Sequence, residues 1–311
     1  MTELNNPIVS VVIPTYNRAD IVARAIKSVA CQTFAGWELL VVDDGSADDT
    51  EKVVASFGDQ RIRYLRHERN RGQSSAQNTG IRSSRGAYVA FLDSDDEWMP
   101  EKLAKVVACF EESAQDVGLV YSGKKLVTEG GQTLKLRSPT LQGDVYKNLL
   151  EWDFIGSCSR VVVRRSILEQ VGGFDEQLVN CQDWDLWIRV SKVSRVAAVP
   201  DCLVIRYFGT DQVTGSLRGI CRGKANMIEK YRDQMSSSVL GKQLATLAIL
   251  LFNYDPASAR RTAFQALKLR PLQPALLMAL AASFLGRRVY GWLFQGYTGH
   301  FHGLYIGRAR V

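Results

Sequence analysis

The chain has 311 residues, of which 46% are hydrophobic and 23% charged, as is usual for a globular protein long enough to bury a core. Its six cysteines form no C-x-x-C pair, which argues against a zinc site or a disulfide framework and favours reduced thiols in the cytoplasm. The net charge of +7 comes entirely from residues 256–311, which hold eight Lys and Arg side chains and no Asp or Glu.

Residues 8–122 alternate short apolar segments with helical patterns, which predicts an α/β fold with a mostly parallel central sheet sandwiched by helices. The strands are expected at IVSVVI (8–13), WELLVV (37–42), IRYLRH (62–67), AYVAFL (87–92) and GLVYS (118–122). The helices between them are expected at 20–31, 48–57, 74–84 and 100–113.

From residue 123 the pattern loosens into edge or mixed strands such as SRVVVRR (159–165) and RVAAVP (195–200). After Ser216 it becomes helical, with helices expected at 217–235, 238–253, 256–269 and 272–285. We therefore expect one domain over 1–216, with halves 1–122 and 123–216, and a helical, basic C-terminal extension over 217–311.

Three of the predicted strands end in polar segments that a parallel sheet would bring to one edge. The segments are PTYNR (14–18), DDGS (43–46) and DSDD (93–96). Each segment alone fits a turn or a helix cap as well as a site. Their coincidence at the edge where open α/β sheets bind ligands favours a site. Asp93 and Asp95 concentrate negative charge there, which Mg²⁺ or Mn²⁺ would neutralise.

Arg71 lies in the segment NRGQ, which precedes the predicted helix 74–84. Its forked donors, together with the N-terminus of that helix, could hold a diphosphate. A solvated basic loop is an equally good interpretation, because phosphate-binding loops without a Gly-rich signature are weakly specified.

Five segments, in this order and spacing, resemble family 2 glycosyltransferases. They are VSVVIPTYNR, LLVVDDGSADDT, HERNRGQSSAQNTGIRSSRGAYVAFLDSDDEW, GGFDE and QDWDLWIRV, and the resemblance covers residues 7–216. It implies a Rossmann-like nucleotide-diphospho-sugar transferase fold and an inverting, nucleotide-sugar-dependent enzyme. A sugar nucleotidyltransferase would instead need a Gly-rich loop where this chain has PTYNR.

The resemblance also implies roles on the donor side. The donor-binding residues would be Pro14, Thr15, Tyr16, Asp43, Arg71 and Asp93. Asp43 would accept a hydrogen bond from the base ring of the nucleotide. Asp95 and Asp93 would hold the Mn²⁺ or Mg²⁺ that bridges the diphosphate and neutralises the leaving group.

On the acceptor side, Asp183 of QDWDLW would be the general base that deprotonates the acceptor hydroxyl. Helical spacing puts Asp183 and Trp187 on one face, and a closed site beside Trp184 would raise the pKa of the base. Trp184 and Asp185 are expected near the acceptor. The alternative is a helix-capping Asp183 with the tryptophans in the core.

Two departures from the family pattern bear on activity. Gln182 stands where an acidic residue is usual, and the segment VIRYFGTDQVTGS lacks the histidine that often binds metal or diphosphate. Arg206 and Asp211 are candidates to replace that histidine. These departures leave a non-catalytic nucleotide-sugar-binding module as the alternative function.

The function implied is transfer of a sugar from a nucleoside-diphosphate sugar, with UDP-sugars favoured, to a glycan or lipid-linked glycan acceptor in cell-surface polysaccharide synthesis. The apolar run at 275–285 is too short to span a bilayer, but it lies beside basic residues and Tyr290, Trp292 and Phe294. We expect a cytoplasmic enzyme that is peripheral on an anionic membrane surface, with a helical cap as the equal alternative. The dispersed basic residues do not predict nucleic-acid binding.

Overall fold

The computed structural model describes residues 6–208 and 217–284, which divide into two compact units. The α/β unit holds residues 6–149, 153–177 and 182–208. The helical unit holds Leu150–Trp152, Leu178–Cys181 and 217–284. The division therefore falls after residue 208, and two short segments from the first 216 residues group with the helices.

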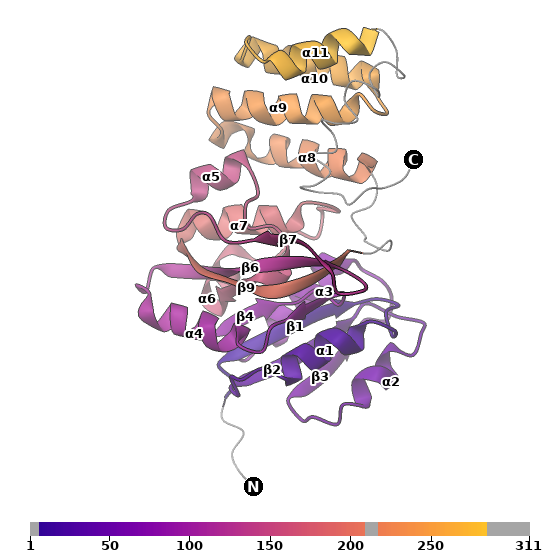
Figure 1. The fold of residues 1–311 in the computed structure, drawn as a ribbon, viewed down its shortest axis with the longest axis vertical. Helices are drawn as coiled ribbons and strands as arrows, with labels where there is room; N and C mark the ends of the chain where they lie inside the picture. The colour runs from indigo at the N-terminus through magenta and orange to yellow at the C-terminus, as the bar shows by residue number, and fades with distance from the viewer. Residues whose placement is uncertain (1–5, 209–216, 285–311) are drawn as a thin grey trace. The chain divides into compact units, whose positions relative to one another are not determined.

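The α/β unit is built on one nine-stranded sheet in the order β3-β2-β1-β4-β8-β6-β9-β5, with β7 paired to β6 (Figure 1). The strands are β1 (Val9–Thr15), β2 (Trp37–Asp43), β3 (Ile62–Arg66), β4 (Tyr88–Phe91), β5 (Asp96–Trp98), β6 (Val117–Thr128), β7 (Thr133–Arg137), β8 (Val161–Arg164) and β9 (Arg195–Phe208). Strands β3, β2, β1 and β4 are parallel, whereas β8 and β5 pair antiparallel with their neighbours. The expected parallel sheet is thus found in the first half, and the second half is mixed.

Helices cover both faces of this sheet. Helices α1 (Val22–Ala30), α2 (Thr50–Ala55) and α4 (Lys102–Glu112) share one core with the sheet. The other helices of the unit are α3 (Gln73–Ser83), α6 (Arg165–Val171) and α7 (Gln182–Val193). A Cβ at Gly80 of α3 would lie 2.3 Å from Val12 Cγ1, so this glycine lets α3 approach β1 closely.

The central strands are apolar runs because both of their faces are covered. All seven residues of β1 and all seven of β2 are buried, as expected for parallel strands between helical layers. Helix α1 meets them with Val22, Ala25, Ile26 and Val29, a spacing that forms one helix face. The core therefore positions the ends of β1, β2 and β4, where the expected site residues lie.

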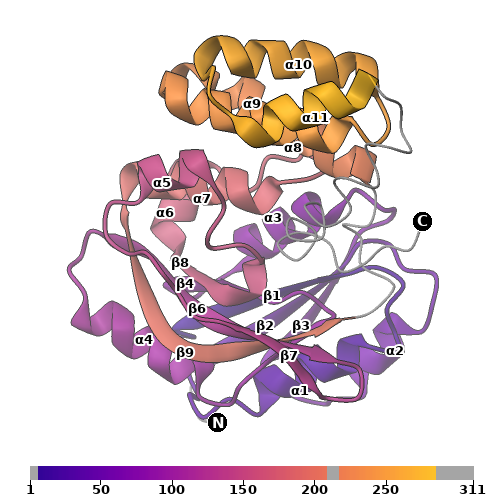
Figure 2. The same ribbon diagram turned by 45° about the horizontal axis from the view of Figure 1, so that its top comes forward.

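The helical unit consists of α8 (Leu217–Tyr231), α9 (Ser237–Leu251), α10 (Pro256–Leu269) and α11 (Pro274–Phe284), preceded in the chain by α5 (Tyr146–Glu151) (Figure 2). The side chains of Ser236 and Asp255 cap α9 and α10, and Pro256 opens α10. The apolar run expected at 275–285 is α11, and no described helix is long and apolar enough to span a bilayer. Tyr290, Trp292 and Phe294 lie outside the described residues, as do Arg287, Arg288, Arg308 and Arg310.

Candidate active site

The loops that follow β1 and β2 are hydrogen-bonded to each other at one edge of the sheet. Thr15 and Asp43 end the two strands side by side, and the Thr15 carbonyl accepts from the Asp44 amide at 2.9 Å. Asn17, at φ +50°, donates its amide to Ser46 Oγ at 2.8 Å. Parallel pairing of β4 with β1 adds the end of a third strand to this edge, so the three polar segments converge as predicted.

Asp43 is buried at this edge, and each of its carboxylate oxygens already accepts one hydrogen bond. Oδ1 accepts from the Ser46 amide at 2.8 Å, and Oδ2 accepts from the Tyr64 hydroxyl. Each oxygen can accept a further bond, which leaves Asp43 able to meet a base ring. Beside it, Thr15 Oγ1 is buried without a hydrogen-bond partner, and Tyr16 is exposed.

Asp44 organises the loop that leads into α3, a role that sequence reasoning missed. Its carboxylate accepts from the Arg71 amide at 2.9 Å and from the Gly72 amide at 2.7 Å. It also hydrogen-bonds His67 Nδ1 at 2.7 Å, while His67 Nε2 reaches Thr79 Oγ1 at 2.9 Å. The loop from residue 67 to 72 is therefore held by one buried carboxylate.

Arg71 and Gln73 extend from this loop in different directions. The Arg71 guanidinium is half exposed and lies 3.8 Å from Glu176. The Gln73 side-chain amide donates to Asp93 Oδ1 at 3.2 Å. Gln73 thus contacts the acidic cluster directly, whereas Arg71 is paired with the GGFDE segment.

The acidic cluster consists of Asp93, Asp95 and Asp96. Asp93 Oδ2 accepts from Ser157 Oγ at 3.1 Å, and Asp95 Oδ2 lies 3.2 Å from Arg18. Asp96 opens β5, and its Oδ2 is buried without a hydrogen-bond partner. Three carboxylates therefore lie within four residues of chain, and one has an unsatisfied oxygen.

The charges of this cluster perturb one another. Burial raises the pKa of Asp93, and the Asp95 charge raises it further. Burial likewise raises the pKa of Asp96 to about 7. Arg206 lies opposite Asp96 in the register of β9 and β5, and although burial alone would lower its pKa, the carboxylates of Asp96, Asp93, Asp95 and Asp183 raise it. Arg206 is thus a second cation near the cluster after Arg18, in the segment where the family often has histidine.

These residues fit a hard divalent cation. The cluster holds three carboxylates beside Arg18 and Arg206, and Asp96 Oδ2 has no hydrogen-bond partner. Within the described residues, however, no set of three His, Cys, Asp or Glu side chains is arranged as a ready metal site. Asp93 and Asp95 would therefore offer part of the oxygen ligands, with the rest coming from substrate phosphates and water.

Asp183 lies in the first turn of α7 and has the properties of a base. Its Oδ1 is buried without a hydrogen-bond partner, and Cys158 lies beside its carboxylate. Burial raises the pKa of Asp183 to about 7, and the Asp93 charge adds to the shift. A carboxylate with this pKa can take up a proton near neutral pH.

One short loop, residues 153–158, connects these groups, and the sequence analysis did not identify it. Asp153 accepts from the Gly156 amide at 2.8 Å. Ser157 donates to Asp93, and Cys158 lies beside Asp183. The segment is small and polar, with no motif that would have marked it. Adjacent residues of this loop therefore contact Asp93 and lie beside Asp183.

The expectation that Trp184 and Asp185 contact an acceptor needs correction, because both lie in the core. The Trp184 side chain is 5% exposed, and its indole donates to the Leu149 carbonyl at 2.7 Å. Asp185 is fully buried and paired with Arg189 at 2.8 Å, one turn later in α7. Their side chains are committed within the α/β unit.

The GGFDE segment is a packing element that joins α3 to α7. Phe174 packs edge-on against Phe91 and Trp187, with ring centroids 5.2 Å and 6.5 Å away. Asn78 of α3 accepts from the Phe174 amide at 2.8 Å and donates to its carbonyl at 2.9 Å. Gly173 has φ +71°, and a Cβ there would lie 2.6 Å from Asn78 Oδ1.

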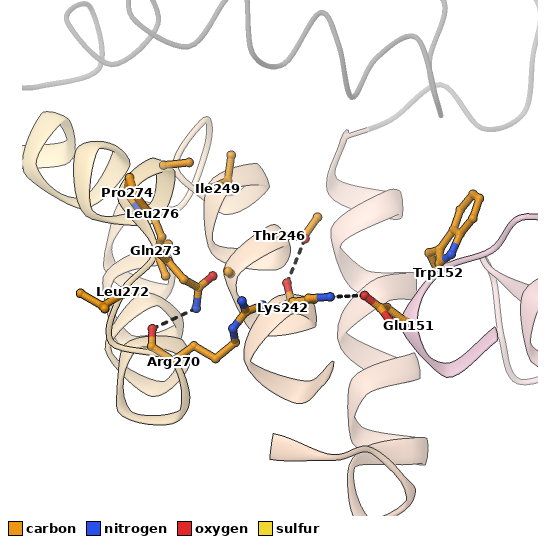
Figure 3. Close-up of a pocket in the computed structure, with 12 residues that line it drawn as sticks. Glu151, Trp152, Lys242, Thr246, Ile249, Arg270, Leu272, Gln273, Pro274 and Leu276 are labelled. Carbon is orange, nitrogen blue, oxygen red and sulfur yellow. Dashed lines mark hydrogen bonds and ion pairs between the residues drawn. The ribbon is translucent and has the colours of Figure 1, made fainter. Parts of the chain in front are cut away.

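The helical unit has a pocket of about 440 Å³, shown in Figure 3, that holds none of the expected site residues. Lys242 and Glu151 form an ion pair in it, and Thr246 donates to the Lys242 carbonyl at 3.0 Å. Gln273 donates to the Arg270 carbonyl at 3.1 Å. Several of its polar groups are already bonded to one another, so we assign no ligand to this pocket.

Comparisons with known proteins agree with this geometry. The sequence profile described as Glycosyl transferase family 2 matches residues 10–172. The chain is 33% identical over 196 residues to the Escherichia coli UDP-Glc:alpha-D-GlcNAc-diphosphoundecaprenol beta-1,3-glucosyltransferase WfgD, covering 63% of this chain and 74% of WfgD.

Two solved structures share the fold. S. aureus TarS 1-349 in complex with UDP has a TM-score of 0.59 at 19% identity, covering 93% of this chain and 91% of that one. The mannosyltransferase PcManGT from Pyrobaculum calidifontis, in complex with GDP-Man and Mn²⁺, has a TM-score of 0.61 at 20% identity, covering 97% and 88%. The expected Rossmann-like glycosyltransferase fold is therefore confirmed.

Proposed function

Because the chain belongs to glycosyl transferase family 2, we propose that it moves a sugar from a nucleoside-diphosphate sugar to a glycan or lipid-linked glycan acceptor, with inversion. The observation that carries this proposal is the loop at 153–158, in which Ser157 donates to Asp93 and the adjacent Cys158 lies beside the buried Asp183. A carboxylate for the donor and a base for the acceptor are the two groups that an in-line sugar transfer needs.

The donor would bind along the edge formed by β1, β2 and β4. Pro14, Thr15 and Tyr16 would line the nucleotide pocket, with the orphaned Thr15 hydroxyl able to bond a polar group of the donor. Asp43 would accept from the base ring. A UDP-sugar is favoured, since the name of WfgD specifies UDP-Glc and TarS was solved with UDP.

Asp93 and Asp95 would hold Mn²⁺ or Mg²⁺, the ion crystallised with PcManGT being Mn²⁺. When bound, this ion would neutralise charge that develops on the departing diphosphate. Gln73 would orient Asp93 through the 3.2 Å hydrogen bond already present. Arg71 would stay available near the donor only if it leaves Glu176, which lies 3.8 Å away.

Asp183 would take the proton of the acceptor hydroxyl as its oxygen attacks the anomeric carbon. The bond from that carbon to the diphosphate breaks as the new glycosidic bond forms on the opposite face, so the configuration inverts. The raised pKa of Asp183, about 7, matches the proton it must accept near neutral pH. The acceptor would be a lipid-linked glycan in cell-surface polysaccharide synthesis, as the diphosphoundecaprenol in the name of WfgD suggests.

The test is release of nucleoside diphosphate from a donor panel of UDP-Glc, UDP-GlcNAc and GDP-Man with Mn²⁺, with and without acceptor. Asp183→Asn should lower kcat by about 10² or more while leaving the Kd for UDP unchanged. Asp95→Asn should weaken metal-dependent UDP binding, measured by calorimetry. Donor binding without turnover in the wild type, across the panel, would favour the non-catalytic binding module instead.

We also propose that the helical unit docks on the anionic cytoplasmic face of the plasma membrane. Apolar side chains are exposed on it, with Leu272 89%, Met278 59% and Phe264 52% accessible. Arg261 and Lys268 are exposed on α10, and residues 256–284 contain no acidic side chain. The protein should sediment with anionic vesicles at low salt, because each basic residue near the surface contributes about 1 kcal/mol. Leu272→Asp combined with Met278→Asp should release it, and unchanged sedimentation would contradict the proposal.

A further inference from the structure

Lys124 of β6 is a half-buried lysine whose ammonium has no hydrogen bond or ion pair within the described part of the chain. Burial lowers its pKa to about 7, and the charges of Arg206 and Arg160 act in the same direction. Keeping an unpaired ammonium out of water is costly, and such groups gather at functional sites. The Asp96 charge opposes this shift, and Lys124 in turn lowers the pKa of Asp153, but neither carboxylate is within ion-pair distance, so the ammonium can still take up an anion.

Arg206 and Arg160 are the two cations that lower the pKa of Lys124 most, and of the two only Arg160 has hydrogen-bond partners among the described residues. The Arg160 guanidinium donates to the main-chain carbonyls of Ser122, Phe154 and Ile155, so its charge is used to hold the chain. Arg206 makes no hydrogen bond or ion pair within the described residues, although the acidic cluster raises its pKa. Lys124 is thus the free ammonium here, and the charge of Arg206 lies beside it.

Lys124 lies against the same loop that holds the base. A Cβ built on Gly156 would be 3.9 Å from Lys124 Nζ. Gly156 is followed by Ser157, which donates to Asp93, and by Cys158, which lies beside Asp183. Two residues of chain span at most about 7 Å, so Cys158, beside Asp183, lies within about 7 Å of Gly156.

We propose that Lys124, supported by the charge of Arg206, binds a phosphate group of the acceptor. The inference rests on the proposed function, in which Asp183 deprotonates a hydroxyl of the acceptor sugar. A phosphate on the anomeric oxygen of that sugar would meet Lys124 beside Gly156 while the reacting hydroxyl meets Asp183 beside Cys158. The donor diphosphate is placed instead at Asp93 and Asp95, on the far side of Ser157.

The site can be tested by the ³¹P line width of inorganic phosphate added to protein saturated with UDP and Mg²⁺. Wild-type protein should broaden the line saturably with UDP present, because the acceptor subsite remains open. Lys124→Met should weaken this binding about tenfold or more, the scale of one lost charge-assisted hydrogen bond. Lys124→Arg should restore part of it, since the positive charge returns.

Lys125→Met is the matched control, because the next residue of β6 points to the opposite face of the sheet. It should bind phosphate as the wild type does. Equal broadening by wild type and Lys124→Met would overturn the proposal, and so would complete loss of broadening when UDP is added, which would assign Lys124 to the donor diphosphate. The assay needs no turnover, so absence of nucleoside diphosphate release would count against the proposed function and not against this site.

Discussion

Replacing Asp44 with alanine removes the one carboxylate that holds the loop from residue 67 to 72. In the wild type, Asp44 is 3% exposed and accepts from the amides of Arg71 and Gly72 and from the His67 ring. The variant leaves three donors without this acceptor. Water can reach the two amides, because Arg71 is exposed and Gly72 half-buried, but His67 is buried.

These contacts set the expected loss of stability. Hydrogen bonds to a charged acceptor contribute about 1.5–3 kcal/mol each, and access of water brings the two amides below that range. We therefore expect Asp44→Ala to lower the free energy of unfolding by about 3 kcal/mol. For a unit of this size that corresponds to a fall in Tm of roughly 6–12 °C.

Thermal and urea unfolding of wild type and variant would measure this loss. Asp49→Ala is the control, because Asp49 is exposed and its partner Lys52, at 2.7 Å, is 80% exposed. Such a surface pair contributes about 0–1 kcal/mol, so this control should unfold nearly as the wild type does. The reasoning fails if Asp44→Ala unfolds within about 0.5 kcal/mol of the control.

Three further predictions concern the site and its surroundings. Below pH 7 the kcat of the wild type should fall by about tenfold per pH unit, because burial raises the pKa of Asp183 to about 7 and the base must be ionised. If an Asp183→Asn variant showed the same fall at acid pH, Asp183 would not be the base. Gly173→Ala should destabilise the protein more than Gly172→Ala, since both have a left-handed φ but only Gly173 faces Asn78, and equal Tm values would contradict this. Burial lowers the pKa of Lys102 to about 7, so between about pH 7 and about pH 10 the unfolded state binds more protons than the folded state. The free energy of unfolding of the wild type should therefore rise with pH in this range relative to Lys102→Met. Parallel pH profiles of urea unfolding for the two proteins would disprove this.

The arrangement of the donor side could be predicted because strong local signals coincide there. Apolar runs with buried residues on both faces define β1, β2 and β4, and each ends in polar residues, so Asp43 and Asp93 were expected at one edge. Parallel pairing then brings them together without any further information. The antiparallel β8 lies within SRVVVRR, which was expected as an edge or mixed strand, whereas β5 has only three residues, too few to show a period, and was not predicted.

The acceptor side depended on contacts that sequence patterns do not encode. Ser157 and Cys158 are common small residues, and their importance comes only from what they touch. Asp185 was misassigned although a signal was present, because Arg189 follows it at the spacing of one helical turn and could compensate a buried charge. Lys124 stands next to another lysine in the sequence, and only the alternation of β6 distinguishes the two.

The adjacency of Ser157 and Cys158 has a mechanical consequence. Ser157, which donates to Asp93, and Cys158, which lies beside Asp183, are joined by a single peptide bond. The distance between these two contacts is therefore limited by covalent geometry. Insertion of one residue between Ser157 and Cys158 would lengthen this connection by up to about 3.6 Å. Such a shift would misalign the acceptor hydroxyl with the leaving diphosphate without replacing any of the proposed catalytic side chains.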